Sequence, residues 1–261
     1  MLRYENRRSL VTGGGSGIGQ ATVLRILAEG GRVVASDVSE QGLADTVAKA
    51  GDGADRLKTV VVNIADEASV KAGVAEALEF LGGLDALVNA AGILRSSHTE
   101  QTTLDSFEQV LRINLVGTFL MIRESLPALK QGQNAAVVNF SSTSAGFAHP
   151  YMAAYAASKG GIQSMTHALA SEFAKDNIRF TSVQPGSISS GMTDGSGASR
   201  QSAGPGLPED ADMSLFMKLA PALGQGFASP ETVAGVVAML ASDDGAFITG
   251  TEIRIDGGTH F

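Results

Sequence analysis

Three side chains capable of acid–base chemistry stand at regular spacing in the second half of the chain. Ser142 follows an apolar run from Ala135 to Phe140. Tyr155 comes thirteen residues after Ser142, and Lys159 comes four residues after Tyr155. If the residues from Tyr151 onward are helical, Tyr155 and Lys159 project from one face, because side chains at i and i+4 are neighbours. A nearby ammonium favours the phenolate, so this spacing predicts a lowered pKa for Tyr155 and a usable acid or base nearer neutral pH. Ser142 could then hold the oxygen on which the proton arrives or departs.

The overall composition limits the classes of protein that this chain can represent. Its 261 residues are 44% hydrophobic and 18% charged, which is typical of one folded α/β domain rather than a disordered chain. The formal net charge is −8, so neither nucleic acid nor an anionic membrane is expected as a partner. The absence of cysteine and the four scattered histidines exclude disulfides, thiolate chemistry and a recognisable metal site. Because no signal peptide or apolar run of about twenty residues is present, the expected location is the cytoplasm.

Short apolar runs alternate with longer helical patterns along the whole chain. This alternation predicts a doubly wound α/β Rossmann fold, with about seven parallel strands and helices on both faces, in a single domain over residues 1–261. The first run, residues 9–12, enters a glycine-rich turn, residues 13–19, and then a helical pattern that continues to Ala28. A strand, a glycine turn and a helix in this order present backbone N–H groups and a positive helix end to a pyrophosphate.

A carboxylate ends the second apolar run. Asp37 closes the run from Gly31 and lies twenty residues after Gly17. An acidic side chain at about this offset can accept hydrogen bonds from an adenosine ribose and would repel a 2′-phosphate, which favours NAD over NADP. Asp37 could also be the N-cap of the helix that follows, and the two roles are compatible.

Together these motifs resemble the short-chain dehydrogenases/reductases over nearly the whole chain. Ser142, Tyr155 and Lys159 match the family's Ser…Tyr-x-x-x-Lys signature. The turn reads Thr-Gly-x-x-x-Gly-x-Gly over residues 12–19, the family's spacing, rather than the strict Gly-x-Gly-x-x-Gly. Residues 89–92 match its Asn-Ala-Gly type of motif, and residues 249–258 match its closing strand and Asp-Gly-Gly turn.

The resemblance implies a catalytic set made of Asn114, Ser142, Tyr155 and Lys159. Asn114 lies within an amphipathic pattern from Leu104 to about Lys130, which predicts one long helix. In the family an asparagine at this place holds a water beside the lysine and extends the proton relay to solvent. Ser141 is the alternative to Ser142, which is preferred for its separation from Tyr155.

The resemblance also implies the contacts to a nicotinamide cofactor. They are Gly13, Gly15, Ser16, Gly17, Ile18, Gly19, Asp37, Asn63, Ile64, Asn89, Ala90, Ala91, Gly92, Tyr155, Lys159, Pro185, Gly186, Ile188 and Ser190. Asn63 replaces the family's usual aspartate near the adenine, although its amide oxygen could still accept from the adenine amino group. Asn89 is expected to tie neighbouring strand ends together. Ser16 and Val38 stand where relatives that prefer NADP often carry Arg or Lys, so NAD is expected, and NADP less so.

The regular alternation stops between about residues 190 and 228. A long insertion after the sixth strand is more often a functional lid than a linker, so this segment is expected to cover the substrate. Its apolar residues could line a substrate pocket: Met192, Leu207, Met213, Leu215, Phe216 and Met217. Between Ser142 and Tyr155, His149 could contact a polar group of the substrate, or it could be a surface loop residue. The other histidines suggest no role.

The resemblance implies an oxidoreductase that moves a hydride between NAD and a secondary alcohol or ketone, plausibly apolar or alicyclic in view of the lid. One alternative is an NADPH-dependent reductase of 3-oxoacyl thioesters, which would use the same residues. A second alternative is a non-catalytic homologue that senses nucleotides, since a fold alone does not specify a function. Relatives are usually homotetramers or homodimers, so a homo-oligomer is expected.

Overall fold

A computed structural model of the chain describes residues 2–194, 205–224 and 226–260. A seven-stranded sheet lies at its centre, with the strand order β3-β2-β1-β4-β5-β6-β7 and parallel pairing throughout. The strands are β1 (Arg8–Thr12), β2 (Arg32–Asp37), β3 (Leu57–Val61), β4 (Ala86–Asn89), β5 (Ala136–Phe140), β6 (Arg179–Pro185) and β7 (Thr251–Ile255). The order reverses between β1 and β4, so a ligand crevice is expected beyond the carboxyl ends of these strands. The predicted fold class is confirmed.

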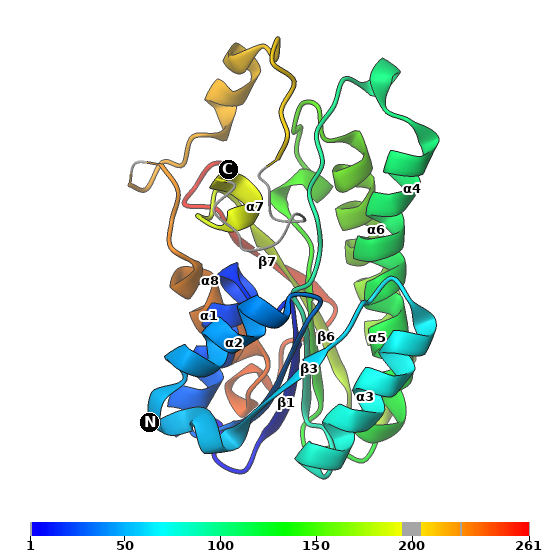
Figure 1. Cartoon of the computed structure of the whole chain (residues 1–261), viewed down its shortest axis with the longest axis vertical. Coiled ribbons are helices and arrows are strands. Elements are labelled where there is room, and N and C mark those ends of the chain that lie inside the picture. The colour runs from blue at the N-terminus through cyan, green and yellow to red at the C-terminus, as the bar shows by residue number, and fades with distance from the viewer. Residues whose placement is uncertain (1, 195–204, 225, 261) are drawn as a thin grey trace.

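Helices cover both faces of the sheet (Figure 1). On one face lie α1 (Gly17–Ala28), α2 (Glu40–Lys49) and α8 (Pro230–Leu240). On the other lie α3 (Glu67–Leu81), α4 (Leu104–Leu111), α5 (Gly117–Leu129) and α6 (Ala153–Glu172). The short helix α7 (Gly191–Asp194) and the 3₁₀ helix η7 (Met213–Leu219) follow β6. No helix in the described ranges combines the length and apolar character needed to cross a bilayer.

The core is divided into two layers by the sheet. Leu10 of β1 packs into the cluster shared with α3, α5 and α6, whereas Val11 packs into the cluster shared with α1 and α8. Val137 and Val138 of β5 divide in the same way. Because successive side chains of a strand point to opposite faces, strands covered on both sides must be apolar throughout. This requirement explains the short, unbroken apolar runs of the sequence.

The long helix predicted from Leu104 to Lys130 is interrupted. A π-helical turn, Arg112–Val116, separates α4 from α5, and Asn114 is buried in its middle. A π turn inserts extra backbone into a helix and re-aims the side chains next to it. The 3.6-residue apolar pattern continues across the turn, and therefore the sequence pattern did not reveal it.

Candidate active site

A cavity of about 610 Å³ opens beyond the carboxyl ends of the strands. Its walls come from the glycine-rich turn, from the segments after β2 to β6, from the start of α6 and from described parts of residues 190–227. Lys159 is the only lysine or arginine among the described residues that line it. A concave, largely apolar space with a few polar groups is the usual form of a cofactor and substrate site.

The glycine-rich turn passes too close to its neighbours to carry side chains. A Cβ at Gly13, whose φ is +69°, would lie 2.8 Å from the backbone nitrogen of Ala91. A Cβ at Gly19 would lie 2.1 Å from the carbonyl oxygen of Gly13. The helix α1 starts at Gly17 with no acidic residue in its first turn, and the side chain of its N-cap, Ser16, makes no capping bond. The free N–H groups at this helix end therefore fit a pyrophosphate.

Asp37 lies at the end of β2 and faces the cavity half-buried. Its Oδ2 accepts from the backbone N–H of Gly15 at 3.0 Å, and its Oδ1 accepts from that of Ser39 at 2.9 Å. The N-cap of α2 is Ser39, whose hydroxyl accepts from the N–H of Gly42. The helix-capping role considered for Asp37 therefore belongs to Ser39. Each carboxylate oxygen keeps a lone pair that can accept a hydrogen bond from a hydroxyl group.

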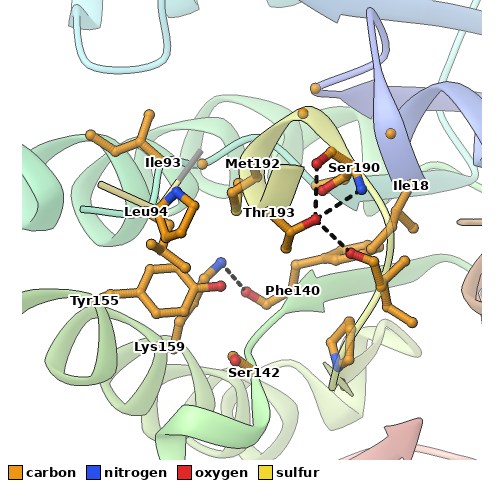
Figure 2. A pocket seen from close by; sticks show the side chains of 18 of the residues that line it. Ile18, Ile93, Leu94, Phe140, Ser142, Tyr155, Lys159, Ser190, Met192 and Thr193 are labelled. Carbon is orange, nitrogen blue, oxygen red and sulfur yellow. Dashed lines mark hydrogen bonds between the residues drawn. The ribbon is translucent and has the colours of Figure 1, made fainter. Parts of the chain in front are cut away.

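Tyr155, Lys159 and Ser142 converge on one wall of the cavity (Figure 2). Both Tyr155 and Lys159 belong to α6, and the Lys159 Nζ lies 5.5 Å from the centre of the Tyr155 ring. The Nζ donates to the carbonyl oxygen of Phe140 at 2.7 Å. Ser142 follows β5 and lies on the same wall of the cavity as Tyr155. The structure thus brings together the three side chains whose spacing suggested acid–base chemistry.

The expected lowering of the Tyr155 pKa is not found. Burial raises the pKa of Tyr155 to about 12, and the nearby Ser142 hydroxyl opposes this only in part. Burial also lowers the pKa of Lys159 to about 8. A buried site of this kind penalises the charged form of either group, and burial sets the direction of both pKa shifts. At neutral pH the pair therefore consists of a phenol and a mostly charged lysine.

The two adjacent serines have different roles. The Ser141 hydroxyl donates to the carbonyl oxygen of Lys159 at 3.0 Å, so its hydrogen is committed to holding α6. The Ser142 oxygen accepts from the N–H of Ser144 at 3.2 Å, which leaves its hydrogen free to be donated. Of the two, Ser142 is the one that can donate to an oxygen beside Tyr155.

Asn114 is fully buried behind the cavity wall. Its Oδ1 accepts from the N–H of Ile93 at 2.8 Å, and its Nδ2 donates to the Ile93 carbonyl at 2.9 Å and to the Ser158 hydroxyl at 3.0 Å. Both amide hydrogens are thus used within the protein. In this structure Asn114 joins the loop after β4 to α6, whereas the water-holding role was implied only by resemblance.

Asn89 also lies behind the wall, although it was placed among the cofactor contacts. Its Nδ2 donates to the Asn139 Oδ1 at 2.9 Å, and the Asn139 Nδ2 donates to Thr166 of α6 at 2.9 Å. These bonds join β4, β5 and α6, as expected for the structural role of Asn89. Since Asn89 does not line the cavity, any effect on a cofactor is indirect.

The remaining expected cofactor contacts all line the cavity. Three of them are engaged locally. The Asn63 Oδ1 accepts from the N–H of Ala65 at 3.1 Å, so it offers only its second lone pair to an adenine. The carbonyl oxygens of Ile188 and Ser190 both accept from the hydroxyl of Thr193, at 3.0 and 2.9 Å (Figure 2). Thr193, which the sequence motifs did not single out, therefore fixes this loop.

The expected lid residues separate into two groups. Met192, Leu207, Met213 and Phe216 line the cavity. Leu215 and Met217 do not, and they are 50% and 77% exposed. In η7 successive side chains point in different directions, so only one side of the turn can face inward. Residues 195–204 and 225 of the expected lid lie outside the described residues.

His260 lines the same cavity and was not expected there. Its ring stacks on Phe147 with centroids 4.0 Å apart, and its centroid lies 5.9 Å from that of His149. The His260 Nδ1 lies 3.1 Å from the Oδ2 of Asp256. An aspartate and a histidine four residues apart follow β7, but only the folded chain brings them beside His149.

Comparisons with known proteins agree with this geometry. A family model described as short chain dehydrogenase matches residues 7–201. The chain is 35% identical over 257 residues to a 3-oxoacyl-(acyl-carrier-protein) reductase of Thermotoga maritima, covering 98% of this chain and 99% of that protein. It is 35% identical over 259 residues to a levodione reductase of Leifsonia aquatica, covering 98% and 95%.

Solved structures share the fold over almost the full length. A 3-ketoacyl-(acyl-carrier-protein) reductase of Brucella melitensis, complexed with NADH, superposes with a TM-score of 0.84 at 28% identity, covering 98% of this chain and 99% of that one. A short chain dehydrogenase of Burkholderia cenocepacia, in complex with NADP, gives 0.84 at 29% identity, covering 98% and 99%. The family match, the sheet order and the placement of Ser142, Tyr155 and Lys159 lead to one conclusion. The chain belongs to the short-chain dehydrogenase/reductase family, whose members are oxidoreductases that use NAD or NADP and act on CH–OH groups.

Proposed function

We propose that this enzyme is an NAD-dependent oxidoreductase that interconverts a secondary alcohol and a ketone of modest size. The observation that carries the proposal is the convergence of Ser142, Tyr155 and Lys159 on a cavity that also contains the glycine-rich turn. One cavity thus provides both a pyrophosphate cradle and a proton-transfer site.

The described residues fit a nicotinamide dinucleotide. The Gly13 and Gly19 positions leave no room for a Cβ, and the free helix end of α1 faces the cavity. When bound, the cofactor supplies the hydride acceptor or donor. The segment from Pro185 to Ser190 lines the same cavity and would flank the nicotinamide end.

The choice of NAD rests on charge at the end of β2. The Asp37 carboxylate can accept from the hydroxyls of an adenosine ribose, and it would repel a 2′-phosphate. Val38 and Ser16 beside it are uncharged, and Lys159 is the single lysine or arginine among the described lining residues. A 2′-phosphate at Asp37 would therefore lack a cationic partner.

Proton transfer is assigned to Tyr155. In reduction its hydroxyl donates a proton to the substrate oxygen, and in oxidation its phenolate removes the proton of the alcohol. Ser142 donates a hydrogen bond to the same oxygen as charge develops on it. The Lys159 ammonium, held by the Phe140 carbonyl, lies 5.5 Å from the centre of the Tyr155 ring and stabilises the phenolate as it forms.

The substrate-facing wall is largely apolar. Met192, Leu207, Met213 and Phe216 belong to the segment after β6, which we propose acts as a lid within a single domain. Such a wall favours an apolar or alicyclic substrate, because it gains free energy by removing apolar surface from water.

The test compares NAD with NADP. Cofactor-dependent thermal shifts come first, followed by initial rates on a panel of secondary alcohols and ketones. Tyr155→Phe should abolish turnover, and Tyr4→Phe is the matched control, because its hydroxyl bonds the Ala238 carbonyl away from the cavity. Preference for NADP would refute the Asp37 argument. Binding of NAD without turnover of any panel member, unchanged in Tyr155→Phe, would instead support a nucleotide sensor.

A second candidate is reduction of 3-oxoacyl thioesters. It is favoured by the similarity to the Thermotoga maritima reductase over 98% of this chain. An acetoacetyl thioester belongs in the panel for this reason. If it is reduced with NADPH faster than any simple ketone with NADH, this candidate replaces the first.

A further inference from the structure

Two imidazoles from distant parts of the chain face the substrate end of the cavity. His149 lies between β5 and α6, and His260 follows β7. Their rings are nearly parallel, with an interplanar angle of 24° and centroids 5.9 Å apart. Phe147 stacks on the ring of His260. The two imidazoles place polar groups in this part of the cavity, and Phe147 packs against His260 without lining the cavity.

The orientation of His260 is fixed by Asp256. The Asp256 Oδ2 lies 3.1 Å from the His260 Nδ1 and also accepts from the His260 backbone N–H at 3.2 Å. Burial opposes ionisation of Asp256, but the bonds from His260 and Gly258 hold its pKa below the usual range. Because the Nδ1 faces a carboxylate, it acts as the donor to Asp256, which leaves the Nε2 available to a ligand.

His149 has one nitrogen engaged and one free. Its Nε2 lies 3.2 Å from the hydroxyl oxygen of Thr143, and its Nδ1 makes no hydrogen bond to any described residue. Burial, reinforced by the proximity of His260, lowers the pKa of His149 to about 4. The ring is therefore uncharged at neutral pH, and it offers its free nitrogen as a hydrogen-bonding group.

We propose that His149 and His260 form a subsite that binds a second, uncharged oxygen of the substrate, a hydroxyl or a carbonyl. This inference rests on the proposed function, in which the reacting oxygen lies at Tyr155 and Ser142. The substrate class is then a ketone or alcohol with a further oxygen function, such as a hydroxyketone, a diketone or a diol.

The charges around the subsite exclude an anionic group as its ligand. Asp256 lies beside His260, and Arg254, whose Nε is 3.7 Å from the Asp256 Oδ2, lies over the Phe147 ring and does not line the cavity. A carboxylate or phosphate at the two rings would lack Arg254 as a partner and would be repelled by Asp256. Burying a charge without a partner is costly, whereas a neutral oxygen needs only a hydrogen bond.

An apolar group at the same place would leave the ring nitrogens unpaired. Sites that hydrogen-bond a substrate oxygen discriminate strongly against analogues that lack it, because the buried polar groups of the protein lose their partners. The two imidazoles should therefore contribute more to the choice between oxygenated and apolar substrates than the apolar residues of the lid do.

The experiment compares shape-matched ketones. Cyclohexanones that carry a hydroxyl at the 2, 3 or 4 position are measured against the corresponding methylcyclohexanones, with NADH. We expect kcat/KM for at least one hydroxyl isomer to exceed that of its methyl partner by about tenfold or more, mainly through KM. If every methyl compound is reduced as well as its hydroxyl partner, the subsite is refuted and the proposed function stands. If none of the ketones is reduced, both fail together.

Variants identify the residues responsible. His149→Phe and His260→Phe should each reduce the hydroxyl-to-methyl ratio towards one, and His149→Asn, which keeps a polar atom near the Nδ1, should restore part of it. His167→Phe is the matched control, because His167 bonds Glu252 outside the cavity and should leave the ratio unchanged. A ratio that survives in both ring variants would overturn the assignment. The wild-type ratio remains decisive if a variant does not fold.

Discussion

The Lys159 ammonium is bonded to the carbonyl oxygen of Phe140 at 2.7 Å, and not to the hydroxyl of the neighbouring Tyr155. Phe140 is the last residue of β5, so the sheet itself positions the one lysine that lines the cavity in the described chain. This hydrogen bond holds the Lys159 ammonium beside the Tyr155 phenol. This arrangement has measurable consequences for stability.

Comparison of wild type with Lys159→Met should show how far the buried Lys159 ammonium lowers the free energy of unfolding. The folded pKa of Lys159 is lowered from 10.5 to about 8, so the unfolded chain binds the extra proton between these values. Its contribution to stability is therefore complete above about pH 10.5 and is lost as the pH falls through about 8, a change of at most about 3 kcal/mol.

Urea unfolding of wild type and Lys159→Met at pH 7 and pH 10 checks this sign. The free energy of unfolding of wild type should rise relative to the variant as the pH increases. Tyr155 has the opposite dependence, because its pKa is raised to about 12 and its contribution is lost above pH 10, but this dependence is common to both proteins. A difference between the two proteins that is independent of pH would show that Lys159 is not desolvated.

Ser142→Ala and Ser141→Ala make the same chemical change at adjacent positions with different expected outcomes. Ser142→Ala removes a donor to the substrate oxygen, so kcat should fall by about 10²–10³-fold, and loss of the bond from the Ser144 N–H should lower the free energy of unfolding by about 1 kcal/mol. Ser141→Ala removes the bond to the Lys159 carbonyl, so the free energy of unfolding should fall by about 1 kcal/mol while kcat falls less than tenfold. Steady-state kinetics and urea titrations measure both. Equal losses of kcat would mean that the hydroxyls share one role.

Asn114→Leu should destabilise the chain by about 2–4 kcal/mol, because three buried partners on Ile93 and Ser158 lose their hydrogen bonds. The measurement is the free energy of unfolding in urea. Asn63→Leu is the matched control at an exposed position, with one local bond to Ala65, and should change it by less than about 1 kcal/mol. A small effect at Asn114 would contradict its role as the link between the β4 loop and α6.

Gly13→Ala should weaken cofactor binding at least tenfold. Its φ of +69° is strained for alanine, and the new Cβ would lie 2.8 Å from the Ala91 nitrogen, displacing the turn. Gly51→Ala is the control, since its φ of +52° carries similar strain but no atom lies within 4 Å of its Cβ. Titration of NADH fluorescence compares the two dissociation constants. If both variants bind NADH alike, the close approach to Ala91 is unimportant.

Asp37→Ser should shift cofactor preference towards NADP. Removing the carboxylate removes the repulsion of a 2′-phosphate and one acceptor for the ribose hydroxyls, so the ratio of kcat/KM for NADP to that for NAD should rise by about 10-fold or more. Asp66→Ser, at the N-cap of α3 and outside the cavity, is the control. An unchanged ratio would mean that preference is set elsewhere.

The sequence by itself determined the order of strands and helices, the glycine-rich turn and the Ser142, Tyr155 and Lys159 set. These features depend on local rules. Strands covered on both faces need unbroken apolar runs, a close turn needs glycine, and an i, i+4 pair shares one helix face. Their positions along the chain can therefore be predicted without knowledge of the fold.

Only the tertiary structure decided the features that depend on burial or on distant contacts. The pKa of Tyr155 is raised and not lowered, because desolvation is a property of the surrounding wall. Asn114 sits in a π-helical turn that the apolar pattern did not mark. His260 lies near His149 because the loop after β5 reaches past the neighbouring strand β6 to the residues that follow β7, where Phe147 stacks on His260. No periodic pattern within either segment predicts this contact.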